Sequence, residues 1–109
     1  MTRSHLIAVS LGAGLLVCAA FSAPTKGDPA KGKEAFEQCA ACHNTDTDEK
    51  KMGPSLKGLF KKGKLASGKK LTEANVIARI NEGGNGMPPY KDILSDQERA
   101  NLIAYLKTI

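Results

Sequence analysis

The sequence predicts an all-α protein with three main helices and one short helical turn. Two observations predict this class. Three sites carry a helix start signal, namely a capping side chain ahead of an apolar-periodic segment at Asp28, Thr72 and Ser95. No segment alternates apolar and polar residues as a half-buried strand does. The loops between these helices are long for a 109-residue chain, so we expect them to pack on something other than a sheet.

The first predicted helix begins at Asp28, with Pro29 at its first helical position, and runs to about Cys39. Residues 44–52 are polar and charged without periodicity, which predicts a loop. A short helical turn is expected from Leu56 to Phe60, closed by Gly63.

The second predicted helix starts after Thr72 and ends at the glycine pair of residues 83–84. Its apolar face consists of Val76, Ile77 and Ile80. The last helix starts at Ser95, and Glu98 three residues later completes a capping box. Its predicted buried stripe consists of Leu102, Ile103, Tyr105 and Leu106.

The N-terminal residues 1–23 are predicted to be a secretory signal peptide, which leaves one domain at residues 24–109. Arg3 is followed by an uncharged, largely apolar run of 18 residues ending in small side chains, the layout of an export signal. Two other readings are a retained membrane anchor, since the run is at the lower edge of a spanning length, and lipidation at Cys18. All three place the domain outside the cytoplasm, in the periplasm or an equivalent compartment.

Removal of the leader concentrates the reactive side chains in one motif. The leader contains Cys18 and His5, so the domain keeps two cysteines and one histidine, Cys39, Cys42 and His43, in the stretch CAACH. Only one charged residue, Arg3, is lost with the leader, so the net charge falls from +5 to +4.

Several chemistries use closely spaced cysteines. A thioredoxin-like dithiol needs a strand before the motif, and here a helix precedes it. Structural zinc needs four ligands, whereas the motif offers three. A local disulfide suits an oxidising compartment but leaves His43 unexplained. C-x-x-C-H is the attachment motif of c-type haem, in which two thioethers hold the porphyrin and the next residue places its imidazole under the iron.

Together with three further stretches, this motif resembles the class I (His–Met, monohaem) c-type cytochromes over essentially the whole domain. The stretches are GPSLKGLF at 53–60, GMPPY at 86–90 and LIAYLK at 102–107. The segment between His43 and Met87 is shorter than in mitochondrial members, so the chain is more similar to the small bacterial and photosynthetic ones.

The resemblance implies a cytochrome c-like fold wrapped around one haem c, covalently bound through Cys39 and Cys42. His43 would be the proximal ligand, its ring held by the carbonyl of Pro54, and Met87 the distal ligand, with Met52 as the rival methionine. Gly32 and Phe36 would meet the last helix where the first and last helices cross. The expected apolar wall of the haem pocket consists of Leu56, Leu59, Phe60, Ile80, Tyr90, Ile93 and Leu102.

A haem with both axial positions filled suits electron transfer and leaves no position for a substrate, so the implied function is a one-electron carrier and not an enzyme. Methionine ligation raises the reduction potential, which we expect to lie above that of the hydrogen electrode. Two alternatives remain: a haem enzyme or gas binder with a labile sixth ligand, and a thiol–disulfide oxidoreductase using Cys39 and Cys42.

Eight lysines and no acid lie between residues 50 and 72. This charge predicts acidic redox proteins as partners, approached by electrostatic steering. No aromatic residues are interleaved to stack bases, which argues against nucleic acid. Membrane contact is expected only through an N-terminal anchor, and the carrier is expected to be a monomer.

Overall fold

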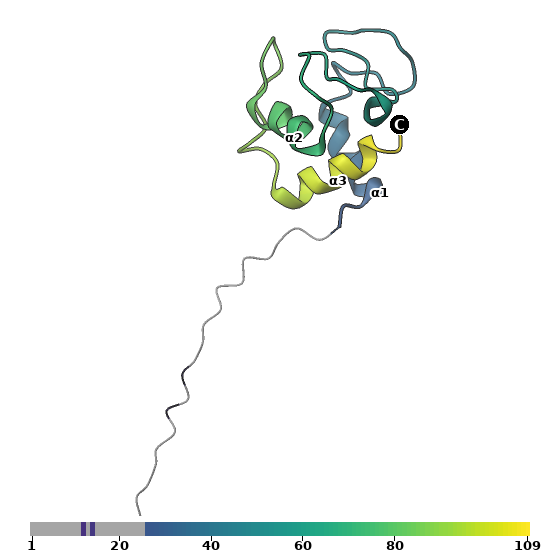
Figure 1. Ribbon diagram of the computed structural model, residues 1–109. Helices are drawn as coiled ribbons and strands as arrows, with labels where there is room; N and C mark the ends of the chain where they lie inside the picture. Colours follow the sequence, from purple (N-terminus) through teal and green to yellow (C-terminus); the bar gives the residue numbers. More distant parts are fainter. Residues whose placement is uncertain (1–11, 13, 15–25) are drawn as a thin grey trace, which may run out of the picture.

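The computed structural model describes residues 12, 14 and 26–109 and confirms the all-α class. Its elements are α1 (Pro29–Ala35), η1 (Phe36–Gln38), η2 (Leu59–Lys61), α2 (Glu73–Glu82) and α3 (Asp96–Leu106) (Figure 1). Over this described part, extended pairing is limited to two isolated bridges, Lys64 with Lys70 and Gly84 with Met87. The predicted leader, apart from Gly12 and Gly14, lies outside the described residues, and Cys18 lies outside them too. None of the described helices has the length and apolar character needed to cross a membrane.

The three main helices start at the predicted caps. The Asp28 carboxylate accepts hydrogen bonds from the backbone N–H of Ala30 and Lys31. The Thr72 hydroxyl accepts one from Asn75. At α3 both halves of the capping box are present, because Glu98 N–H donates to the Ser95 hydroxyl and Ser95 N–H donates to the Glu98 carboxylate.

The first and last helices cross in close contact (Figure 1). A Cβ atom on Gly32 would lie 1.9 Å from the backbone oxygen of Asn101, so only glycine allows this approach. Beside it, the rings of Phe36 and Tyr105 pack with their centroids 5.4 Å apart. The buried Asn101 side-chain oxygen accepts hydrogen bonds from Asp28 N–H at 2.9 Å and from Gln97 Nε2 at 3.0 Å. The crossing is therefore fixed in both spacing and register.

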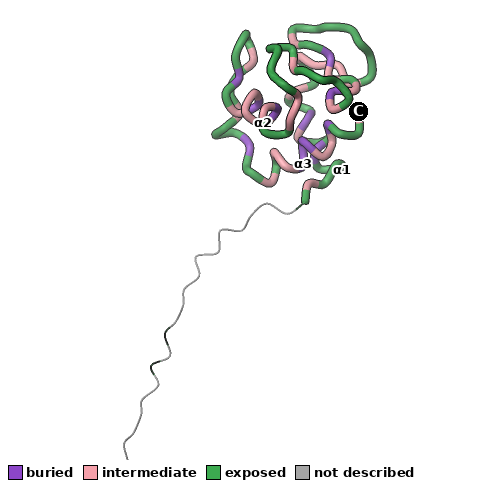
Figure 2. The backbone as a smooth tube through the Cα atoms, in the orientation of Figure 1, coloured by how far each residue is buried: buried purple, intermediate pink, exposed green. Residues whose placement is uncertain are grey.

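One apolar core joins the helices and the short η2 turn. Figure 2 shows buried positions on the facing sides of α1, α2 and α3 and exposed positions along the outer loops. The buried apolar side chains are Phe36, Leu59, Val76, Ile80, Leu94, Leu102, Ile103 and Leu106. The predicted faces of the second and last helices lie in this core, with Ile77 and Tyr105 only partly buried.

Two boundaries differ from the sequence prediction. The first helix is α-helical only to Ala35 and tightens into the 3-10 turn of η1 before Cys39. The short helical turn expected at residues 56–60 is the 3-10 turn η2 at Leu59–Lys61. Its N-cap is Gly58 in a left-handed conformation (φ 63°), so the turn begins three residues later than expected.

Candidate functional site

The CAACH motif forms a single tight turn at the end of η1. The N–H groups of Cys42 and His43 both donate to the carbonyl of Cys39, at 3.1 and 3.0 Å. Both cysteines are partly buried, and no disulfide joins them to each other. Burial raises the pKa of the Cys39 thiol, and the charge of Cys42 raises it further. One turn thus carries two cysteine sulfurs and an imidazole within five residues.

The His43 ring is held in one tautomer by a backbone carbonyl. Its Nδ1 lies 2.7 Å from the oxygen of Pro54, which can only accept a hydrogen bond. Nδ1 therefore carries the proton, and Nε2 keeps its lone pair for a metal.

A glycine gives the His43 ring its space. A Cβ atom on Gly53 would lie 2.5 Å from His43 Cε1 and 2.8 Å from Nδ1. The N–H of Gly53 also donates to the carbonyl of Cys42 at 2.8 Å. These contacts fix the segment that carries Pro54 against the CAACH turn.

Met87 lies on a tight turn that follows α2. The backbone groups of Gly84 and Met87 pair in both directions, at 2.9 and 3.0 Å. The two residues between them, Asn85 and Gly86, have φ of 52° and 88°, as in the two-residue turns that favour Asn-Gly. Met87 is partly buried and packs against the apolar core.

The chain after Met87 returns to the end of α2. Tyr90 N–H donates to the carbonyl of Ile80 at 2.9 Å. Burial raises the pKa of the Tyr90 phenol, and the charges of Cys39 and Cys42 add to this effect. Cys39 of the CAACH turn and Met87 of this loop both pack against the same apolar core.

Met52 and Ile93 are both exposed and lie outside the apolar core. The side chain of Met52 is 85% exposed, in contrast to the partly buried Met87. Ile93, expected in the apolar wall, is 60% exposed, and its neighbour Leu94 is buried instead. The remaining expected wall residues are buried or packed against the core.

A surface groove of about 430 Å³ opens between η1 and the 44–51 loop. His43, Phe36 and Tyr105 contribute to its lining, together with charged side chains that include Lys33 and Asp46. Cys39, Cys42 and Met87 do not line it. The groove is therefore lined by other side chains than Cys39 and Met87, which pack against the core.

The residues present fit a haem c. Two thiols on one turn suit two thioether bonds, and an imidazole with a free Nε2 suits iron. A thioether is available from Met87, which packs against a core that includes the apolar side chains of Leu59 on η2 and of Val76 and Ile80 on α2. Within the described part of the chain, no cluster of three or more His, Cys, Asp or Glu side chains offers a site for a bare metal ion.

Comparisons with known proteins agree with this geometry. Residues 29–109 match the family described as Cytochrome c. A cytochrome c2 of Rhodospirillum rubrum is 31% identical and aligns over 91% of this chain and 96% of its own. A cytochrome c6 of Diacronema lutheri is 31% identical over 73% of this chain and 94% of its own.

Solved structures show the same likeness. Cytochrome c6 from the diatom Phaeodactylum tricornutum superposes with a TM-score of 0.58 at 34% identity, covering 75% of this chain and 93% of its own. Cytochrome cH from Methylobacterium extorquens gives 0.56 at 27% identity, covering 76% and 100%.

The fold and the CAACH turn define a small all-α haem protein with covalent attachment. The chain belongs to the cytochrome c family. It binds one haem c through Cys39 and Cys42 and acts as an electron carrier that exchanges electrons with redox proteins, not as an enzyme.

Proposed function

We propose that the chain is a one-electron shuttle in which His43 and Met87 are the two axial ligands. The observation that carries this proposal is the hydrogen bond from His43 Nδ1 to the Pro54 carbonyl, which fixes the orientation of the ring and leaves Nε2 free to bind iron. The partial burial of Met87, against the exposed side chain of Met52, favours Met87 as the second ligand.

The bound haem supplies a single-electron ferric/ferrous couple. The chain sets the energy of that couple through the two ligands and their surroundings. The Met87 thioether favours the reduced state, and the apolar side chains of Leu59, Val76 and Ile80 disfavour the extra charge of the oxidised state. We expect a midpoint potential above that of the hydrogen electrode.

The carrier is proposed to work outside the cytoplasm as a domain of residues 24–109, after export through the leader at 1–23. The charge pattern of the leader supports this, as does the haem attachment motif. The mass of the protein purified from a haem-attaching host distinguishes the possibilities. A mass that lacks about 23 residues supports cleavage, whereas a full-length mass supports a retained anchor.

The partners are proposed to be redox proteins with acidic docking surfaces. Between η2 and α2 all the charged side chains are exposed lysines. With the adjacent lysines they form a basic lobe consisting of Lys57, Lys61, Lys62, Lys64, Lys69 and Lys70. Such a lobe attracts acidic surfaces over about one Debye length, roughly 10 Å at 0.1 M salt. Reaction with an acidic redox protein should therefore slow steeply as the ionic strength rises.

A redox titration combined with carbon monoxide tests the carrier against the alternatives. A carrier with both axial positions filled gives a one-electron Nernst curve at positive potential and binds carbon monoxide poorly at neutral pH. Tight carbon monoxide binding by the native ferrous protein would instead indicate a gas binder or haem enzyme. Alkylation of Cys39 and Cys42 in the purified protein would indicate free thiols and the oxidoreductase alternative.

A further inference from the structure

The two arginines of the domain occupy equivalent roles at the two ends of one loop. The chain has thirteen lysines but only three arginines, and Arg3 belongs to the leader. The other two, Arg79 and Arg99, both donate to backbone carbonyls of residues 83–94. We call this segment the ligand loop, because it contains Met87.

Arg79 holds the start of the ligand loop. Its Nη1 donates to the carbonyl of Gly83 at 3.0 Å. It also lies against Gly84, where a Cβ atom would be 2.8 Å from the same nitrogen. Gly84 in turn pairs with Met87 through two backbone hydrogen bonds. In the described part of the chain, no carboxylate forms an ion pair with Arg79, so its main polar contact is with the loop.

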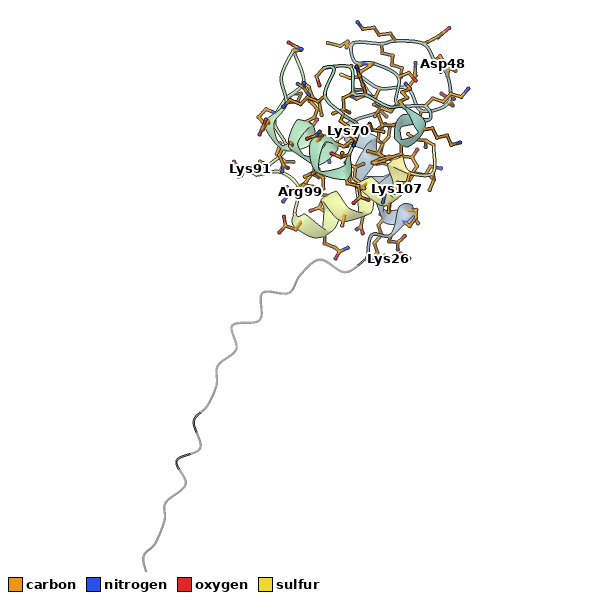
Figure 3. The ribbon with its side chains drawn as sticks, in the orientation of Figure 1. Lys26, Asp48, Lys70, Lys91, Arg99 and Lys107 are labelled. Carbon is orange, nitrogen blue, oxygen red and sulfur yellow. The ribbon has the colours of Figure 1, made fainter. Side chains whose placement is uncertain are left out.

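Arg99 holds the end of the ligand loop. Its Nη1 donates to the carbonyls of Leu94 and Lys91, at 2.6 and 3.2 Å. Its Nη2 pairs with Asp96, one turn earlier on α3. The Arg99 side chain is only 13% exposed. Figure 3 shows Arg99 on α3 beside Lys91 of the loop. One guanidinium thus joins three acceptors, which a lysine ammonium on a flexible stem does not do with the same geometry.

We propose that Arg79 and Arg99 are positioning residues that clamp the two ends of the ligand loop and thereby set how tightly Met87 binds the iron. The inference rests on the proposed function, in which Met87 is the axial ligand. Arg79 fixes the loop to α2 and Arg99 fixes it to α3. Loosening either end lets the loop move away from the core while the helices stay folded.

The test uses the charge-conserving variants Arg79→Lys and Arg99→Lys in the haem-loaded protein. Imidazole competes with Met87 for the ferric iron, so its apparent affinity reports how easily the methionine leaves. Loss of one hydrogen bond from a charged donor predicts roughly tenfold tighter apparent imidazole binding in each variant. Amide hydrogen exchange at Met87 and Tyr90 should accelerate by a similar factor, and this second measurement does not depend on the ligand.

Asn101→Ala is the matched control, because it removes the hydrogen bonds to Asp28 and Gln97 at the crossing of α1 and α3 but touches no loop carbonyl. It should lower the melting temperature without changing imidazole affinity. Arginine variants that melt earlier but keep wild-type imidazole affinity and loop exchange would overturn the clamp. If the wild-type ferric protein lacks the far-red band of methionine ligation, the ligand assignment fails. Exchange rates in the loop then still decide whether the arginines hold it.

Discussion

The imidazole of His43 donates from Nδ1 to the backbone carbonyl of Pro54 over 2.7 Å. This contact joins two segments that are separated by the polar, charged loop of residues 44–52. It orients the ring and selects its tautomer, the task that such outer hydrogen bonds perform at metal sites. A backbone carbonyl cannot be removed by replacing a side chain, so the contact is best tested through the neighbouring Gly53.

Gly53→Ala should disturb the His43 ring. The new Cβ would lie within 3 Å of two ring atoms, so the ring or the backbone must shift. We expect a loss of about 1–3 kcal/mol in the free energy of unfolding, the usual cost of overpacking. The midpoint potential should change as well, because the orientation of the imidazole changes. Denaturant unfolding and a redox titration measure the two effects.

The chain offers a matched glycine for this experiment. A Cβ atom on Gly63 would meet nothing within 4 Å, and Gly63 has no positive φ. Gly63→Ala should therefore leave both the stability and the potential close to wild type. Equal behaviour of the two alanine variants would show that the space around His43 is not restricted.

Gly32→Ala should separate α1 from α3. The added carbon would lie 1.9 Å from the Asn101 carbonyl, which belongs to the rigid backbone of α3. Alanine gains about 1 kcal/mol in helix propensity over glycine, but this gain is smaller than the cost of the clash. We expect the melting temperature to fall by about 10 °C, since 1 kcal/mol corresponds to about 4–8 °C in a domain of this size. A variant that melts later than wild type would mean that the helices do not touch here.

The Tyr90 phenol should stay neutral to higher pH than an ordinary tyrosine. Burial is the largest cause of its raised pKa, and this cause does not depend on the charge of the two thiols. With a folded pKa above the unfolded one, the stabilisation from Tyr90 is complete below the ordinary tyrosine value of about 10. It is then lost as the pH rises through the folded value.

Ring NMR signals of Tyr90 in a Tyr105→Phe background, followed up to strongly alkaline pH in the ferrous protein, measure this titration. Tyr90→Phe should remove the corresponding loss of stability. Titration of Tyr90 at or below the ordinary value would contradict the placement of its phenol against the core.

The helix starts were predictable from the sequence because each is a local signal. Asp28, Thr72 and Ser95 bond to N–H groups two or three residues away, and no tertiary information is needed. The crossing of the first and last helices at Gly32 was predictable only through the family resemblance. Nothing local in the sequence around Gly32 points to Asn101.

The remaining features depend on three-dimensional contacts. Arg79 and Arg99 have no sequence signal, because a side chain that bonds to a distant carbonyl leaves no pattern. The sequence also does not distinguish Ile93 from Leu94, two adjacent apolar residues of which the turn after Tyr90 buries the second. The start of η2 depends on the left-handed conformation of Gly58, which the apolar pattern of the sequence does not reveal.

The ligation by Met87 is tested most directly by the oxidised spectrum of two methionine variants, Met87→Ala and Met52→Ala. We expect the weak far-red band of methionine-ligated ferric haem in wild type and in Met52→Ala, since Met52 is 85% exposed. Met87→Ala should lose the band, and its midpoint potential should fall. A band that survives in Met87→Ala and disappears in Met52→Ala would contradict the proposed ligation and the role of the ligand loop.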